Sequence, residues 1–401
     1  MPFLYWGWQR KNVIEALLKY LQDAFESANL SNNGKYPSLI REYTTANGSR
    51  VLQLLSDGVV LSQYIEKKLI LENKLGVEIE AIRQHRQYPK VIELEFASGP
   101  LEELYKLLEI TGFENFTFPI GKTRTERVIG DLKKIPHYLF AGMTGKGKSS
   151  FIKTMITVLL ANNRKLEVLF VDLKGTEAPL FVGHPRVKIA LSEVEALKLI
   201  RSADKMLTDR KEDFRKLKVP DFESYNSKVE NSRQLPRNVL VVDEIAQLTP
   251  TLALHHHAEI KESSLLLNKI ARMGRSHGIH LVIGVQKPDS RNLDTTIKSN
   301  AEGVICFPVH NQTQSRVVLD NNRAMELGGV VGRAVWQTPG EEKIVQTPFL
   351  TREKIMAFIV EEKRNGKAEQ GLAADDVGGS GDQADNSENS QDSGAWSHLN
   401  K

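Results

Sequence analysis

Five short apolar runs within residues 132–345 constrain the fold of this chain more than any other feature of its sequence. They occupy residues 137–141, 167–171, 239–242, 280–285 and 303–307, and helical stretches separate them. Near-continuous apolar strands that alternate with helices are typical of a parallel sheet covered on both faces. The sequence therefore predicts an α/β domain, in which ligands gather at the carboxyl ends of the strands.

The first apolar run leads into the sequence GMTGKGKS at residues 142–149, which has the pattern G-x-x-x-x-G-K-[ST]. Its glycines allow the backbone to curl so that successive N–H groups face a chain of phosphates, and the helix predicted over 150–160 points its positive end at them. The residues predicted to bind ATP are Gly142, Met143, Thr144, Gly145, Lys146, Gly147, Lys148, Ser149 and Ser150. Within this set, Lys148 is expected to reach the β- and γ-phosphates, and Ser149 to be a ligand of Mg²⁺.

Polar residues follow the other apolar runs at the same predicted edge of the sheet. The run 239–242 is followed by Asp243, a predicted Mg²⁺ ligand, and by Glu244, which is placed to polarise the attacking water. Gln286 follows the run 280–285, and its amide is expected to sense the γ-phosphate and to orient water. The sequence DLKG at 172–175 also lies at this edge, where a supporting role and a simple turn remain alternative interpretations.

Phosphoryl transfer also needs positive charge at the transition state, and a neighbouring subunit commonly supplies it as an arginine. The candidates for this trans-acting role are Arg275 and Arg316. For either of them, a structural role at the surface is the alternative, and the sequence does not select between the two.

Residues 1–130 have a mixed pattern that predicts a small α/β unit. A helix is predicted over 12–28, strands over 50–55 and 90–96, and one helix over 61–84 between the strands. The aromatic residues within 2–8 are expected to pack on this unit, with docking to a partner or a membrane interface as the alternative.

The net charge of +4 conceals a segregated distribution. Residues 366–401 carry seven acids and two bases, a net charge of −5, so the remaining residues carry +9. This last segment has almost no aliphatic side chains and is predicted to be a disordered acidic tail, either a solvated end or a partner-binding, DNA-mimicking segment. The single cysteine, Cys306, excludes an internal disulfide and a cysteine zinc cluster. No apolar run reaches the ~18–20 residues of a membrane span, so a cytoplasmic location is expected.

The segment 130–340 resembles the motor domain of the FtsK/SpoIIIE family of DNA translocases. The stretch 129–149, IGDLKKIPHYLFAGMTGKGKS, is similar to that family's pattern D-L…P-H-hydrophobic-A-G-x-T-G-x-G-K-S. Further matches follow in the family's order at 213–215, 224–226, 235–236, 243–244, 274–275, 278–280, 286–288, 297–300, 315–320 and 328–329.

This resemblance implies a RecA-like P-loop ATPase that uses ATP and Mg²⁺, assembles as a homo-hexamer and moves DNA, duplex in preference to single-stranded. The expected organisation is a small ring-forming type of α/β domain at 1–130, the motor domain at 131–350, a helix at 351–365 and the tail at 366–401.

The compact organisation resembles coupling or transfer ATPases of conjugative plasmids and integrative elements. A relaxase, a replication protein or a membrane transfer channel are the candidate partners, and such a partner would recruit the chain peripherally to the membrane. A nucleotide-switched assembly or adaptor protein and a replication or packaging ATPase of a mobile element are the alternative functions.

Overall fold

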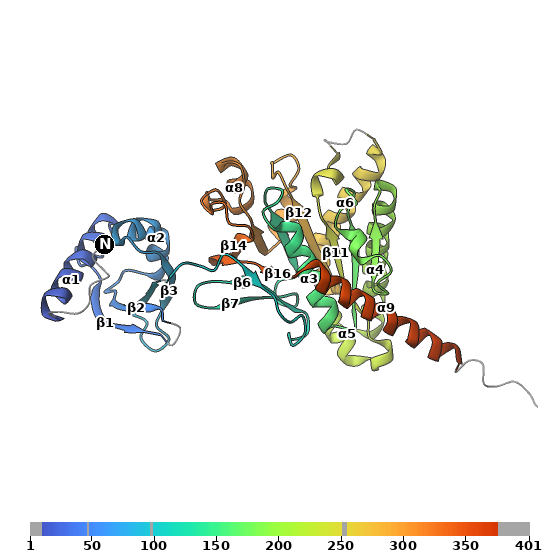
Figure 1. The fold of residues 1–401 in the computed structure, drawn as a ribbon, viewed down its shortest axis with the longest axis horizontal. Coiled ribbons are helices and arrows are strands. Elements are labelled where there is room, and N and C mark those ends of the chain that lie inside the picture. Colours follow the sequence, from blue (N-terminus) through green and yellow to red (C-terminus); the bar gives the residue numbers. More distant parts are fainter. Residues whose placement is uncertain (1–9, 46–47, 97–98, 251–254, 376–401) are drawn as a thin grey trace, which may run out of the picture.

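The computed structural model describes residues 10–45, 48–96, 99–250 and 255–375. The chain forms two α/β units of unequal size, with the small amino-terminal unit to one side of the large one (Figure 1). The aromatic residues within 2–8 and the segment 376–401 lie outside the described residues.

The small unit is a four-stranded antiparallel sheet covered on one face by two helices. Its strand order is β1-β2-β4-β3. Alternation along β2 and β4 directs Leu52, Leu54, Ile92 and Leu94 into the core beneath the helices. The elements are α1 Arg10–Ser27, β1 Ser38–Thr44, β2 Arg50–Leu55, α2 Leu61–Leu75, β3 Ile79–Gln84 and β4 Val91–Phe96.

The single helix predicted over 61–84 is wrong, because the segment divides into a helix and a strand. The helix α2 ends at Leu75, where Gly76 adopts the left-handed conformation with φ 60°. Residues Ile79–Gln84 then pair with β4 and place Ile79 and Ile82 against the core of the unit. The charged and aliphatic composition of this segment fits both structures, so its periodicity did not reveal the break.

The large unit is built on a ten-stranded sheet with the order β10-β9-β11-β12-β8-β13-β14-β15-β6-β7. The strands from β10 to β13 in this order are parallel, and the remainder pair antiparallel. This is the α/β fold with a mostly parallel sheet that the sequence predicted. The strands are β6 Thr117–Lys122, β7 Arg127–Asp131, β8 His137–Ala141, β9 Leu166–Val171, β10 Val187–Ala190, β11 Arg237–Val242, β12 Ile279–Val285, β13 Gly303–Cys306, β14 Arg333–Thr338 and β15 Glu341–Gln346.

Helices cover both faces of the large sheet. On one face, α3 and α9 pack through residues such as Phe151, Met155 and Phe358, and on the other face α4 and α6 pack through residues such as Ile200 and Leu267. The helices are α3 Lys148–Asn162, α4 Glu193–Leu217, α5 Phe222–Lys228, α6 His257–Met273, α7 Thr295–Asn300, α8 Gln312–Leu319 and α9 Arg352–Asp375. Short 3₁₀ turns lie at η1 Ala178–Phe181, η2 Asn231–Arg233, η3 Ile245–Leu248, η5 Arg275–His277 and η6 Arg323–Met325. Within the described residues, no helix has both the length and the apolar character of a membrane span.

Two element boundaries differ from the sequence prediction. The hairpin β6–β7 belongs to the ten-stranded sheet, although the prediction placed these residues in the first domain. We therefore propose that the second domain begins in the connection 99–116, which also contributes β5 Tyr105–Lys106 to a parallel pair with β16 Pro348–Phe349. The carboxyl-terminal helix was predicted to end at residue 365, whereas α9 continues to Asp375.

The two units are joined by ion pairs between the turn of the β6–β7 hairpin and the start of β3 with the residue before it. Arg124, in that turn, contacts Glu78 at 2.6 Å and Glu80 at 3.4 Å. Burial tends to raise the pKa of Glu78, but the hydrogen bond and the charge of Arg124 outweigh it and lower that pKa. Because the Arg124 side chain is only 16% exposed, this contact is partly shielded from water and ties β3 to the large sheet.

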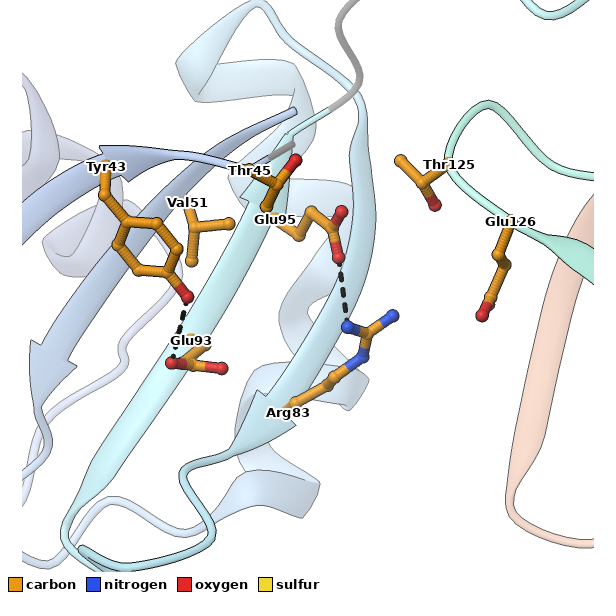
Figure 2. Close-up of a pocket in the computed structure, with 8 residues that line it drawn as sticks. All are labelled: Tyr43, Thr45, Val51, Arg83, Glu93, Glu95, Thr125 and Glu126. Atoms are coloured by element: carbon orange, nitrogen blue, oxygen red, sulfur yellow. Dashed lines mark hydrogen bonds and ion pairs between the residues drawn. The ribbon is translucent and has the colours of Figure 1, made fainter. Parts of the chain in front are cut away.

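A small cleft of about 210 Å³ lies between the same turn and the open face of the four-stranded sheet (Figure 2). Two of its acidic groups are engaged by neighbours within the cleft wall: Tyr43 donates to Glu93 at 3.3 Å, and Arg83 contacts Glu95 at 3.2 Å. The third, Glu126, pairs with Lys343 at 2.7 Å. The acidic side chains of the cleft are therefore all paired, so we interpret the cleft as part of the contact between the two units.

Candidate nucleotide-binding site

The predicted phosphate loop connects β8 to α3 at the carboxyl edge of the large sheet. Two backbone bonds anchor its first residues, from Gly142 N to Val285 O at 3.1 Å and from Met143 N to Pro308 O at 2.9 Å. The helix α3 then begins at Lys148, and the N–H groups of its first turn have no acceptor within the helix. A loop held at its base beside a helix amino terminus is suited to bind an anion such as a phosphate chain.

Close packing explains why glycine is required at two positions of this loop. Gly142 has φ 144°, and a Cβ there would come within 2.5 Å of the Cβ of Phe307. Gly147 has φ 113°, and a Cβ there would lie 3.1 Å from the backbone of Gly332. Both the conformation and the space therefore exclude a side chain, which agrees with the loop geometry that the sequence pattern predicted.

Lys148 and Asp243 meet beneath the loop. The Nζ of Lys148 donates to Asp243 Oδ1 at 2.8 Å and to Asp243 O at 2.7 Å, and both side chains are 3% exposed. Asp243 follows β11, whose register next to β12 places it near the phosphate loop. The lysine expected to bind phosphate and the acid expected to bind Mg²⁺ are thus direct neighbours.

Glu244, Gln286 and Thr144 form a second polar cluster at the same edge. The backbone N of Gln286 donates to both carboxylate oxygens of Glu244, at 3.3 and 3.1 Å. The hydroxyl of Thr144 donates to the side-chain oxygen of Gln286 at 3.1 Å. Lys174, which follows β9, lies 3.4 Å from Oε2 of Glu244. The carboxyl ends of β8, β9, β11 and β12 therefore contribute to one site.

Two oxygen-bearing side chains of the site, those of Ser149 and Asp243, are expected to bind Mg²⁺. Ser149 lies in the first turn of α3, and the Asp243 carboxylate lies beneath the loop. In the described part of the chain, no cluster of three or more His, Cys, Asp or Glu side chains could hold a metal by itself. One hydroxyl and one carboxylate fit Mg²⁺ that arrives with a nucleotide, because this ion keeps most of its ligands from phosphates and water.

The two candidate arginines lie apart from this cluster. Arg275 is in η5, which leads into the amino end of β12, and its exposed side chain contacts Glu302 at 3.3 Å. The length of β12, about 20 Å at ~3.3 Å per residue, separates it from the phosphate loop of its own chain. Arg316 lies on α8, is exposed, and donates from Nε to Asn322 at 3.0 Å.

Sequence reasoning missed a segment that supports the phosphate loop. The N of Gly332 donates to Lys146 O at 3.0 Å, and Lys146 Nζ approaches Gly329 O at 3.4 Å. The glycines at 328 and 329 belong to the family pattern, but their position beside the loop arises from long-range packing. The sequence signal that could have indicated this supporting segment is its glycine-rich stretch just before β14.

The strand–loop–helix unit, the paired Lys148 and Asp243, and the Glu244–Gln286 contact define a P-loop nucleotide-binding domain of the α/β class. Residues 113–290 match the model of the FtsK/SpoIIIE family. The chain therefore carries an FtsK/SpoIIIE family domain, as the sequence motifs predicted.

Two similar relatives are named DNA translocase FtsK. The protein from Helicobacter pylori is 30% identical over 281 residues, which cover 67% of this chain and 32% of the relative. The protein from Caldanaerobacter subterraneus is 33% identical over 261 residues, which cover 60% of this chain and 36% of the relative. The chain thus spans about a third of the length of these curated relatives.

A solved structure of the pCW3 conjugation coupling protein TcpA, a monomer form with ATPgS, has a similar fold. The TM-score is 0.62 at 24% identity, and the match covers 86% of this chain and 98% of that chain. This likeness shows that the fold is shared across most of the chain.

Proposed function

We propose that this chain is an ATP-driven DNA translocase. The observation that carries the proposal is the convergence of Lys148, Asp243, Glu244 and Gln286 at the phosphate loop of an FtsK/SpoIIIE family domain. The relatives named as DNA translocases support the choice of DNA as the substrate that is moved.

Each residue of the site has a separate role in ATP hydrolysis. The N–H groups of the phosphate loop bind the phosphate oxygens, and Lys148 leaves Asp243 to contact the β- and γ-phosphates. Ser149 and Asp243 would hold the Mg²⁺ that arrives with ATP, and the ion would supply positive charge to the phosphates. Glu244 accepts a proton from the attacking water at a carboxylate oxygen, and Gln286 orients that water.

A cleft of about 480 Å³ at the carboxyl edge supports a DNA partner. It lies between the loop after β12, with Lys287 and Arg291, and the amino end of α8, with Asn311 and Gln314. Arg291 is paired with Asp289 of the same loop at 3.0 Å, whereas Lys287 makes no ion pair among the described residues, so the charge of Lys287 remains available to a phosphate backbone. The +9 charge outside the tail favours the same kind of partner.

A ring of identical subunits would complete the site. Arg275 lies at the edge of the sheet opposite to the phosphate loop, so in a head-to-tail ring it is suited to approach the loop of the next subunit. Arg316 is the second candidate for this role. We propose a hexamer, in keeping with the resemblance to the translocase family.

We further propose that the translocase serves DNA transfer in conjugation or another mobile element. The shared fold with the conjugation coupling protein TcpA over 98% of that chain supports this choice. A relaxase, a replication protein or a membrane transfer channel would then be the partner that brings the chain to the membrane from the cytoplasm.

The test is an ATPase assay with duplex and single-stranded DNA over a series of salt concentrations, together with displacement of a triplex-forming strand. We expect stimulation by duplex DNA that falls steeply as salt rises, because phosphate contacts release counterions, and we expect ATP-dependent triplex displacement. ATP binding without DNA-stimulated turnover or displacement would instead indicate a nucleotide-switched adaptor and would overturn the proposal.

A further inference from the structure

Lys174 lies beside the carboxylate of Glu244, and the nucleotide-binding motifs assign it no role. Its Nζ is 3.4 Å from Glu244 Oε2. The Lys174 side chain is 32% exposed, whereas that of Glu244 is 7% exposed. A buried carboxylate needs polar partners, but a lysine with this exposure could equally extend into water. The structure of the backbone around Lys174 must therefore explain why this side chain lies against Glu244 and does not extend into water.

The loop that carries Lys174 is fixed at both ends. Asp172, at its start, is 1% exposed and accepts hydrogen bonds from the N of Gly175 at 3.1 Å, Glu177 at 2.7 Å and Ala178 at 2.9 Å. Glu177, further along the loop, contacts Lys153 of α3 at 2.5 Å. The loop is therefore tied to the helix that follows the phosphate loop, and this is more support than a simple solvent-exposed turn requires.

The register of the sheet brings this loop to Glu244. Val171 pairs with Val242 in the parallel strands β9 and β11, and Asp243 N donates to Val171 O at 3.1 Å. The chain segments that leave these two strands consequently run next to each other. Lys174 approaches Glu244 from the side of β9, while the N of Gln286 approaches it from the side of β12.

We propose that Lys174 is a positioning residue for ATP hydrolysis, which holds the Glu244 carboxylate in the orientation that activates the attacking water. The inference rests on the proposed ATPase function and adds one residue to its site. Glu244 is held by contacts from two neighbouring strands, and loss of Lys174 removes one of them. Because small misplacements of a reacting group are costly, we expect a decrease in kcat of about 10- to 100-fold.

The test measures kcat and KM for ATP in the full chain with Lys174→Ala, Lys174→Arg, Glu244→Gln and the double variant Lys174→Ala/Glu244→Gln. Lys198→Ala is the matched control, because Lys198 is an exposed lysine on α4. We expect Lys174→Ala to lower kcat with KM changed less than about twofold, and Lys174→Arg to restore most of the rate because it retains the charge. In the Glu244→Gln background, measured under single-turnover conditions, removing Lys174 should have little further effect.

Three results would overturn the inference while leaving the proposed function intact. They are an unchanged or increased kcat in Lys174→Ala, a raised KM at constant kcat, and multiplicative losses in the double variant. The raised KM would place Lys174 in nucleotide binding, and the multiplicative losses would separate it from Glu244. A wild-type chain without ATPase activity would overturn the proposed function and this inference together.

Discussion

The Nζ of Lys148 binds both the backbone oxygen and the Oδ1 of Asp243, residues 95 positions apart in the sequence, and both side chains are almost completely buried. A buried ion pair is maintained only if its partners remain satisfied, since breaking it leaves an uncompensated charge. In this structure the lysine that should bind phosphate is held by the acid that should bind the metal. We therefore expect nucleotide binding to exchange this pair of partners for contacts with phosphate and metal.

Lys148→Ala should abolish measurable ATP turnover, because no other described lysine lies in the first turn of α3. It should also lower the free energy of unfolding by about 3–5 kcal/mol, since Asp243 would lose its buried partner. ATPase assays and urea unfolding measure the two effects, with Lys198→Ala as control. Normal DNA-stimulated turnover in Lys148→Ala would contradict the assignment of the phosphate loop.

Glu244→Gln should separate binding of ATP from its hydrolysis. The amide keeps the shape of the side chain and still accepts a bond from Gln286 N, but it is a much weaker base. We expect kcat to fall by about 10²- to 10⁴-fold, while ATP binding by the isolated variant stays within about threefold of wild type. Titration with a fluorescent ATP analogue and single-turnover hydrolysis would measure this. A parallel loss of binding would show that Glu244 supports the nucleotide pocket itself.

The sequence predicted those parts of the site that depend on strand ends. The run 137–141 coincides with β8, and the runs before Asp243 and Gln286 lie within β11 and β12. Because adjacent parallel strands end at the same edge, Asp243, Glu244 and Gln286 had to lie near the phosphate loop. The contact between Lys174 and Glu244 was not predictable in this way, because it depends on the turn that Asp172 stabilises through three backbone bonds.

The antiparallel part of the large sheet could also not be predicted from the sequence. Its strands β6, β7, β14 and β15 come from distant parts of the chain, and β15 joins β6 through the pairing of Gln346 with Lys122. Burial differs from strand to strand here, alternating along β7 and nearly continuous along β6, whereas the central strands β8, β11 and β12 are buried throughout. The near-continuous apolar pattern that identified the central strands therefore does not identify this group. Long-range pairing of this kind is determined by packing and not by local sequence.

Subunit mixing should identify the arginine that acts in trans. If Arg275 serves the neighbouring subunit, Arg275→Ala should lose most ATPase activity but should still bind ATP, because its own phosphate loop is intact. Mixing it with inactive Lys148→Ala should restore part of the activity, since some interfaces then combine an intact loop with an intact arginine. The same mixture made with Arg316→Ala is the comparison. No recovery with either arginine variant would contradict a trans-acting role for both.

Buried histidines should make the chain less stable in acid. The imidazole of His137 accepts a bond from Leu281 N at 2.9 Å, and burial, with a smaller effect of the Arg275 charge, lowers its pKa to about 4. The unfolded chain binds a proton at this residue near the ordinary pKa of 6.5, so the contribution of His137 to stability is constant above that pH and falls as the pH decreases toward 4. The loss from this residue alone amounts to about 3 kcal/mol at the lower end.

His137→Asn removes this titration and retains an acceptor for the Leu281 N–H. The slope of unfolding free energy against pH between about 6.5 and 4 should therefore decrease by about one proton, as measured by urea unfolding at several pH values. His255→Asn is the control, because His255 is exposed and should leave the slope unchanged. Equal slopes for wild type and His137→Asn would show that another group controls the acid dependence.

Deletion of residues 376–401 should tighten DNA binding at low salt. The deleted segment follows α9 and contains five acids and one base, so its removal makes the net charge of the remaining chain more positive by four. We expect the Kd for duplex DNA, measured by fluorescence anisotropy, to fall by about three- to tenfold at ~50 mM salt and to approach the wild-type value at ~0.5 M, where such charges are screened. A full-length variant in which Asp376, Asp382, Asp385, Glu388 and Asp392 are replaced by their amides separates charge from chain length. If the deletion and the neutralised variant both bind DNA as wild type does, the acidic segment does not compete with DNA, and its charge serves only to keep that end of the chain solvated.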